Sequence, residues 1–237
     1  ANYTYAAGEC LETYVSKQEN RFSDKESIIV YLHGGERKKI MVDDFHLADD
    51  IASKAAITTI AVAMTGSGNS TSNRFNGMPW DRDCNQKWLE QDHIDFVAEL
   101  LENIKNKYNK KNLYVIGKSN GGTLASVIAG THPGLIQKVV GMAGGYDMKE
   151  WCRYGHNKYS GSYLTDTHVS KNIKGTKFFL QVGDKDKTTA SIHVAKTFHN
   201  RLQKLGVPSE LKIYPGYDHN IEYETDVKDD AASFLNK

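Results

Sequence analysis

Cysteine is scarce in this chain of 237 residues, which contains only Cys10, Cys84 and Cys152. Their spacing matches no metal-binding motif, and an odd number of cysteines cannot pair completely within one chain. The simplest interpretation is that they are packing residues, and we expect no metal site. If the protein is exported, Cys84 and Cys152 are the pair to test for a disulfide, because both lie in long segments that a crosslink would tether.

The chain also lacks an excess of charge of either sign. It carries 30 basic and 29 acidic side chains, so no long-range field favours nucleic acid or a membrane surface as a partner. No apolar run approaches the roughly 20 residues that span a bilayer, and no charged-then-apolar leader opens the chain. We therefore expect a soluble protein, cytoplasmic or secreted after removal of a signal peptide, since the sequence begins with alanine. Its oligomeric state is left open.

Internal repeats, low-complexity tracts and interdomain linkers are missing too, so residues 1–237 are expected to form one domain. Apolar, β-prone runs alternate instead with stretches of helical periodicity. The expected strands are 28–32, 57–63, 113–116, 138–142, 177–182 and 211–214. The expected helices are 46–56, 92–108, 121–131, 191–205 and 225–235. This alternation predicts an α/β fold with a doubly wound, mostly parallel sheet flanked by helices.

Two segments interrupt the alternation, residues 65–87 and 144–172. Each is too long for a plain connection in a compact domain, and long loops of such folds often build the binding site. Trp80, Trp151 and Tyr154 in these segments are candidates to hold an aryl or sugar ring of a substrate. The alternative is that these aromatic side chains only anchor the loops to the core.

The most informative motif is Gly-x-Ser-x-Gly at residues 117–121, which lies between a strand-like run and a helix-like run. Strand, sharp turn and helix is the context in which this motif presents a nucleophile, because the turn holds the serine in a strained conformation with its hydroxyl exposed. The flanking glycines let strand and helix pass closely. Alone, the motif could be an ordinary glycine-rich turn. Ser119 is therefore a candidate nucleophile that needs partners.

The candidate base is His219, which follows the last strand-like run in Gly-Tyr-Asp-His. A loop at that place would carry its imidazole to the strand ends, so the choice depends on order and location. The candidate acid is Asp186, a few residues beyond the expected strand 177–182, where sites of open α/β sheets are assembled. Asp186 is preferred because Asp184 is better placed to shape the turn. Asp147 is a weaker third option.

Stabilisation of an oxyanion requires donors, and backbone N–H groups are available at two places. His33, Gly34 and Gly35 follow the expected strand 28–32, and the N–H of Gly35 is the expected first donor. The second is the N–H of Asn120, next after the candidate nucleophile and at the start of a helix. A strand-ending turn is the plain alternative for the His-Gly-Gly segment.

The order Ser119, Asp186, His219, with residues 33–35 upstream, resembles that of the α/β-hydrolase superfamily over nearly the whole chain. Residues 92–97 and 114–122 resemble the polyhydroxybutyrate depolymerase and feruloyl-esterase-like group. Residues 214–219 are closer to dienelactone-hydrolase and peptidase-like members. The resemblance implies an α/β-hydrolase fold and a Ser-His-Asp triad, but it says little about the acyl or alcohol group that is accepted.

The leading hypothesis is a serine hydrolase that cleaves carboxylic esters through an acyl-enzyme on Ser119, which requires no cofactor. A thioesterase, peptidase or acyltransferase would use the same triad, and the sequence does not separate these activities. A different class of protein, a binding protein on a hydrolase fold, would normally lack one of Ser119, Asp186 and His219. All three are present.

Overall fold

The computed structural model describes residues 2–17, 19–22, 24–34, 42–63, 89, 91–146, 173, 175–187 and 192–237. Within these residues the strands form an eight-stranded sheet in the order β1-β2-β4-β3-β5-β6-β7-β8. The strands are β1 (Asn2–Ala6), β2 (Glu9–Val15), β3 (Ser27–Leu32), β4 (Thr59–Val62), β5 (Asn112–Lys118), β6 (Lys138–Met142), β7 (Lys177–Gly183) and β8 (Ser209–Tyr214). The pairs β1–β2 and β2–β4 are antiparallel, and all other neighbours are parallel. The predicted mostly parallel sheet is confirmed.

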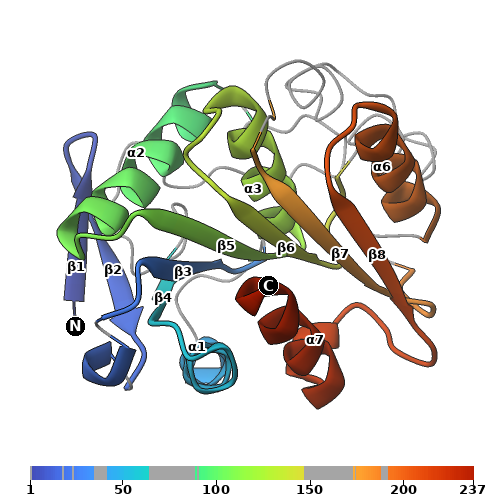
Figure 1. The fold of residues 1–237 in the computed structure, drawn as a ribbon, viewed down its shortest axis with the longest axis horizontal. Helices are drawn as coiled ribbons and strands as arrows, with labels where there is room; N and C mark the ends of the chain where they lie inside the picture. Colours follow the sequence, from blue (N-terminus) through green and yellow to red (C-terminus); the bar gives the residue numbers. More distant parts are fainter. Residues whose placement is uncertain are drawn as a thin grey trace.

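Helices cover both faces of this sheet, as expected for strands that are apolar along their whole length. Figure 1 shows α1 and α7 packed together on one face, with α2, α3 and α6 on the other. Their bounds are α1 (Val42–Ala55), α2 (Gln91–Lys107), α3 (Asn120–Thr131), α6 (Ile192–Lys204) and α7 (Thr225–Asn236). Short 3-10 turns lie at η1 (Glu19–Phe22) and η3 (Ile221–Tyr223). In the part of the chain that the structure describes, no helix has the length and apolarity to cross a membrane.

The connections of the sheet place its topological switch point between β3 and β5. From β3 the chain passes through α1 to β4 on one side, and then through α2 to β5 on the other side of β3. The strand order therefore reverses at these two strands, whose ends meet where Leu32 pairs with Gly117. Open α/β sheets bind ligands beyond the carboxyl ends of the strands at such a switch point. Residues 33–34 and Ser119 follow these two ends directly.

The hairpin of β1 and β2 is absent from the sequence-based expectation. Its two-residue loop, Ala7 and Gly8, has positive φ at both positions, 44° and 93°, as a type I′ turn requires. The side chains that face the core include Thr4 and Thr13, whereas Tyr3 and Tyr5 are exposed. Because the larger apolar side chains of β1 point outward, the alternation of hydrophobicity does not mark this strand, whereas in β2 Leu11 and Val15 face the core.

One face of α2 binds the backbone of edge strand β1. Three α2 residues at successive spacings of four, Glu99, Asn103 and Lys107, face this strand. Glu99 accepts a hydrogen bond from the N–H of Ala7 at 2.9 Å. Asn103 and Lys107 donate to the carbonyls of Tyr5 and Tyr3, at 2.8 and 3.2 Å. Hydrogen bonds to main-chain groups therefore hold the hairpin in addition to the burial of Leu11 and Val15 in the core.

The turn between β5 and α3 depends on two glycines. A Cβ atom added to Gly117 would lie 2.4 Å from the backbone of Gly121, and one added to Gly121 would lie 2.1 Å from the carbonyl oxygen of Leu32. No side chain fits at either distance, because the obstructing atoms belong to backbone. Residues 117–121 therefore form the sharp strand-turn-helix that the motif predicts.

We expect Gly121→Ala to lower the free energy of unfolding by about 3 kcal/mol or more, because the new methyl group would push α3 away from β3. Urea unfolding measures this loss. Gly134→Ala is the matched control: at φ 87° it strains the backbone, but nothing lies within 4 Å of the new Cβ. Its expected cost is about 1–2 kcal/mol. Equal losses in the two variants would contradict the close-packing explanation.

Candidate active site

Ser119 occupies the turn between β5 and α3 in a conformation that L-residues rarely adopt, with φ 51° and ψ −117°. Its N–H donates to the carbonyl of Met142 at 2.8 Å, and its carbonyl accepts from the N–H groups of Gly122 and Thr123 at 3.0 and 3.2 Å. Both backbone groups are thus fixed, one by the neighbouring strand and one by the helix. Such an enforced strain is typical of functional positions.

The loop after β3 lies directly against Ser119. A Cβ atom added to Gly34 would be 3.1 Å from the Cβ of Ser119 and 3.7 Å from its Oγ. The Nδ1 of His33 is 2.7 Å from the carbonyl oxygen of Gly34, and because a carbonyl only accepts, Nδ1 carries the proton. This bond shapes the loop at the point where it passes Ser119. Gly35, the expected first oxyanion donor, lies outside the described residues.

Asp186 and His219 are hydrogen-bonded, as the predicted pairing of acid and base requires. The Nδ1 of His219 lies 2.8 Å from Oδ2 of Asp186, and the side chain of Asp186 is fully buried. A carboxylate accepts, so His219 donates from Nδ1, and in the neutral imidazole Nε2 is then the accepting nitrogen. The imidazole is therefore held in the tautomer in which Nε2 can accept a proton.

Asp184 has a different role, in the turn that supports this pair. Its Oδ1 accepts the N–H of Gly216 at 2.7 Å, which ties the loop after β7 to the loop after β8. The N–H of Lys185 also donates to the carbonyl of Tyr217 at 2.9 Å. A Cβ atom on Gly183 would lie 2.2 Å from that carbonyl oxygen, so the second loop crosses directly over the end of β7.

A buried ion pair joins the segment of Ser119 to the segment of His219. Lys118, the last residue of β5, donates from Nζ to Oε2 of Glu222 in η3. Glu222 follows His219 by three residues. The two segments are therefore in contact, although the chain separates Lys118 from Glu222 by 104 residues.

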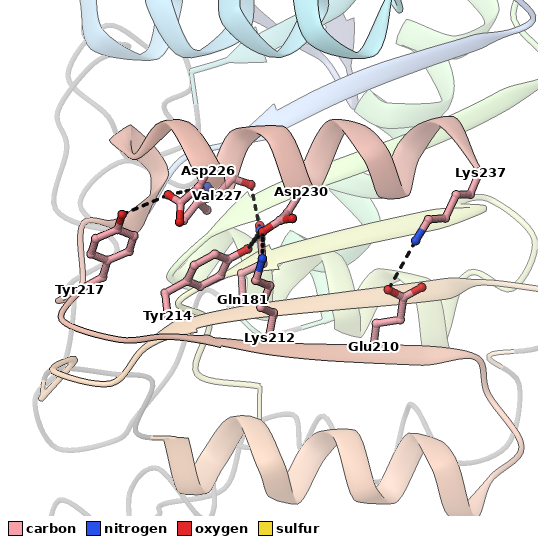
Figure 2. Close-up of polar contacts among 9 residues, drawn as sticks. All are labelled: Gln181, Glu210, Lys212, Tyr214, Tyr217, Asp226, Val227, Asp230 and Lys237. Carbon is pink, nitrogen blue, oxygen red and sulfur yellow. Dashed lines mark hydrogen bonds and ion pairs between the residues drawn. The ribbon is translucent and has the colours of Figure 1, made fainter.

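A polar network beneath α7 supports the end of β8 (Figure 2). The hydroxyl of Tyr214 donates to Asp230 at 2.7 Å and receives a hydrogen bond from Gln181 at 2.6 Å. Gln181 also donates to the carbonyl of Val227 at 2.9 Å, and Lys212 donates to Asp230. Tyr214 ends β8, so the network holds the start of the loop that leads to His219.

The same network perturbs the ionisation of its members. Burial raises the pKa of Tyr214 far above its usual range, and the hydrogen bond to Asp230 raises it further. Burial also acts to raise the pKa of Asp230, but the hydrogen bonds from Lys212 and Tyr214 outweigh this effect and hold the pKa below its ordinary value. The charged form of Asp230 is therefore the form that stabilises the fold.

The remaining sequence-based candidates fall on residues that the structure does not describe. These are Asp147, Trp80, Trp151 and Tyr154, together with Cys84 and Cys152. Asn120 is described: it is the first residue of α3, directly after Ser119. Among the residues described, no three His, Cys, Asp or Glu side chains are grouped as a metal ion would require.

Two contributions to the site were missed by the sequence analysis. The first is Thr123, whose hydroxyl accepts the N–H of Gly145 at 3.1 Å and thereby ties α3 to the segment after β6. The second is the pair of Lys118 and Glu222. A lysine at the end of a buried, apolar strand is the signal that could have drawn attention to it.

Comparison with known proteins assigns the chain to a family. Residues 53–237 match the family model described as prolyl oligopeptidase family. The chain belongs to this family. This is a family of hydrolases, so residues 53–237 form a domain of a hydrolase family. The matched span contains Ser119, Asp186 and His219 and omits residues 33–35.

The chain is also similar in sequence to a curated protein, the probable carboxylesterase SOBER1-like of Arabidopsis thaliana. The two sequences are 30% identical over 150 residues, which is 62% of this chain and 50% of the relative. The chain therefore spans about half the length of the relative it matches.

Solved structures of esterases have the same fold. The Pyrococcus furiosus esterase Pf2001 superimposes with a TM-score of 0.72 and 14% identity, over 99% of this chain and 90% of that one. Est1E from Butyrivibrio proteoclasticus, solved with ferulic acid bound, gives 0.66 and 14% over 100% and 96%. The predicted α/β-hydrolase fold is thereby confirmed.

We expect Asp230→Asn to lower the free energy of unfolding at neutral pH. Because the pKa of Asp230 is lowered in the folded state, its stabilisation is complete above the pKa of an unfolded aspartate, about 3.9, and is lost as the pH falls through the folded value. The deficit of the variant should therefore shrink below about pH 4. Urea unfolding at pH 7 and at several lower pH values measures it.

The control for this series is Glu210→Gln, which removes the exposed ion pair of Glu210 with Lys237, 3.9 Å apart (Figure 2). An exposed pair of this kind contributes less than about 1 kcal/mol at any pH. A deficit of Asp230→Asn that grows on acidification would show that the carboxylate is not the stabilising form.

Proposed function

We propose that the protein is a serine carboxylesterase whose triad is Ser119, His219 and Asp186. The observation that carries the proposal is the hydrogen bond from His219 to the buried Asp186, taken together with the strained backbone of Ser119 at the switch point of the sheet. We place the activity in a single α/β-hydrolase domain spanning residues 1–237, since β1 belongs to the same sheet that α7 covers.

In the first half of the reaction, His219 Nε2 takes the proton of the Ser119 hydroxyl as Oγ attacks the ester carbonyl carbon. The carbonyl oxygen becomes an oxyanion, for which the N–H groups of Asn120 and Gly35 are the proposed donors. Asn120 begins α3, and the positive end of the helix dipole adds to the stabilisation of this charge. Collapse of the intermediate breaks the ester bond, and His219 gives its proton to the leaving alcohol.

In the second half, His219 takes a proton from water while the water oxygen attacks the acyl carbon on Ser119. The second oxyanion intermediate collapses to the carboxylic acid, and the proton on His219 returns to Ser119 Oγ. Asp186 keeps the imidazole in the correct tautomer throughout and stabilises the imidazolium that forms twice per turnover. The cycle uses groups of the chain and water.

The proposed substrates are esters whose acyl group carries an aromatic ring, such as feruloyl esters. This choice is supported by Est1E, which was solved with ferulic acid bound, and by the aromatic residues Trp80, Trp151 and Tyr154, which we propose for the ring. A peptidase is the second candidate, because the chain belongs to the prolyl oligopeptidase family. It would use the same acyl-enzyme with an amine in place of the alcohol.

We expect wild type to hydrolyse members of a panel of acetyl, long-chain acyl and feruloyl esters, acyl thioesters and prolyl peptides. Ser119→Ala should lose roughly 10⁶-fold in kcat on every active substrate, because the nucleophile is gone. A fluorophosphonate probe should label wild type covalently and leave the variant unlabelled. Turnover of any substrate at the same rate by both proteins would show that Ser119 is not the nucleophile for it.

The assignment of the acid is tested by a matched pair of variants. Asp186→Asn should lower kcat by about 10⁴-fold, since an amide at this position favours the wrong tautomer of His219. Asp184→Asn keeps an oxygen that accepts the N–H of Gly216, so it should lose far less. Steady-state kinetics on the best ester of the panel measures both. The reverse order would move the role of the acid to Asp184.

A further inference from the structure

The ion pair of Lys118 and Glu222 lies in the interior of the protein. The side chain of Lys118 is 5% exposed and that of Glu222 is 0% exposed. Removing two charges from water costs several kcal/mol for each ion, and an apolar pair of similar volume is often as stable or more stable. Stability alone therefore gives little reason for a buried lysine and glutamate at these positions.

The sheet order shows what the pair does geometrically. Strands β6 and β7 separate β5 from β8, so Ser119 and the end of β8 lie on strands that are three spacings apart, about 14 Å. The loop after β8 must cross this distance for His219 to reach Ser119. Gly183 lies beneath Tyr217 in this crossing, which shows that the loop passes over the end of β7.

Hydrogen bonds at two places fix the loop along its crossing. Over β7, His219 is bonded to Asp186 and Gly216 to Asp184. At the far end, Glu222 is bonded to Lys118, which immediately precedes Ser119. Because Lys118 belongs to the central strand β5, its position is set by the same backbone that sets Ser119. The ion pair thus fixes the position of the His219 segment relative to β5, the strand that carries Ser119.

We propose that Lys118 and Glu222 are positioning residues that set the distance between His219 and Ser119. This inference rests on the proposed function, because it gives the pair a role in the reaction of that triad. The residues touch no substrate. They act by holding the segment that follows His219 against the end of β5, and a displacement of about 1 Å in such a geometry lowers turnover by about 100-fold.

The test uses two variants whose stability and activity should rank in opposite orders. Glu222→Gln keeps an oxygen that accepts from Lys118 but leaves a buried ammonium without its counter-charge, so it should unfold at a lower temperature than wild type. The double variant Lys118→Met with Glu222→Leu replaces the pair by apolar side chains and should unfold near the wild-type temperature. Its kcat should nevertheless fall by about 100-fold, with KM nearly unchanged.

Glu222→Gln should retain more kcat than the apolar double variant, since its hydrogen bond still ties the two segments. The control is Lys138→Met, which removes another buried lysine. Lys138 begins β6, so it lies at the amino ends of the parallel strands, whereas Lys118 lies at their carboxyl ends. Its Nζ donates to the carbonyl of Leu235 at 2.6 Å. It should lower the unfolding temperature and leave kcat unchanged. Circular dichroism, thermal unfolding and ester hydrolysis are measured on all four proteins.

The proposal is overturned if kcat follows stability, so that the apolar double variant is as active as wild type and more active than Glu222→Gln. It is also overturned if Lys138→Met loses as much kcat as the double variant does. These outcomes differ from failure of the proposed function, in which wild type itself would neither react with the fluorophosphonate probe nor hydrolyse any ester. If the double variant fails to fold, the test is the comparison of Glu222→Gln with Lys138→Met. The proposal requires that Glu222→Gln lose more kcat than Lys138→Met, and an equal or smaller loss overturns it.

Discussion

The contact of backbone with backbone between β5, α3 and β3 is the constraint on which the rest of this molecule depends. Gly121 approaches the carbonyl of Leu32, and Gly117 approaches Gly121, so closely that neither position has room for a side chain. The chain between them must turn within three residues, which forces Ser119 to a positive φ. This strain of about 1–3 kcal/mol is sustained because the surrounding strands are buried on both faces.

Around this fixed point, the other parts of the candidate site are supported in different ways. His33 and Gly34, directly after β3, are positioned by contact with Ser119 itself. His219 comes from a loop that starts after β8, three strands further out than β5, so it needs support along its length. Hydrogen bonds over β7, the network beneath α7 and the ion pair at Lys118 supply that support.

The sequence predicted the parallel core well because buried strands and amphipathic helices leave strong local patterns. Residues 138–142 and 177–182, for example, were expected as strands and lie in β6 and β7. The order of Ser119, Asp186 and His219 along the chain predicted a pairing of Asp186 with His219, and the two are hydrogen-bonded; turn chemistry predicted that Asp184 shapes the turn, where it accepts the N–H of Gly216. The resemblance to known hydrolases named the same residues.

What the sequence did not reveal depends on partners that are far away in the chain. The hairpin of β1 and β2 is held by Glu99, Asn103 and Lys107, about a hundred residues later. The partner of Glu222 is Lys118, and the two meet only because the loop after β8 crosses to the end of β5. Local periodicity contains no information about such pairings.

The hydrogen bonds of α2 to β1 also have a consequence for aggregation. They occupy outward-facing carbonyls of an edge strand. Through such groups the sheet of a second molecule would otherwise add and begin an aggregate.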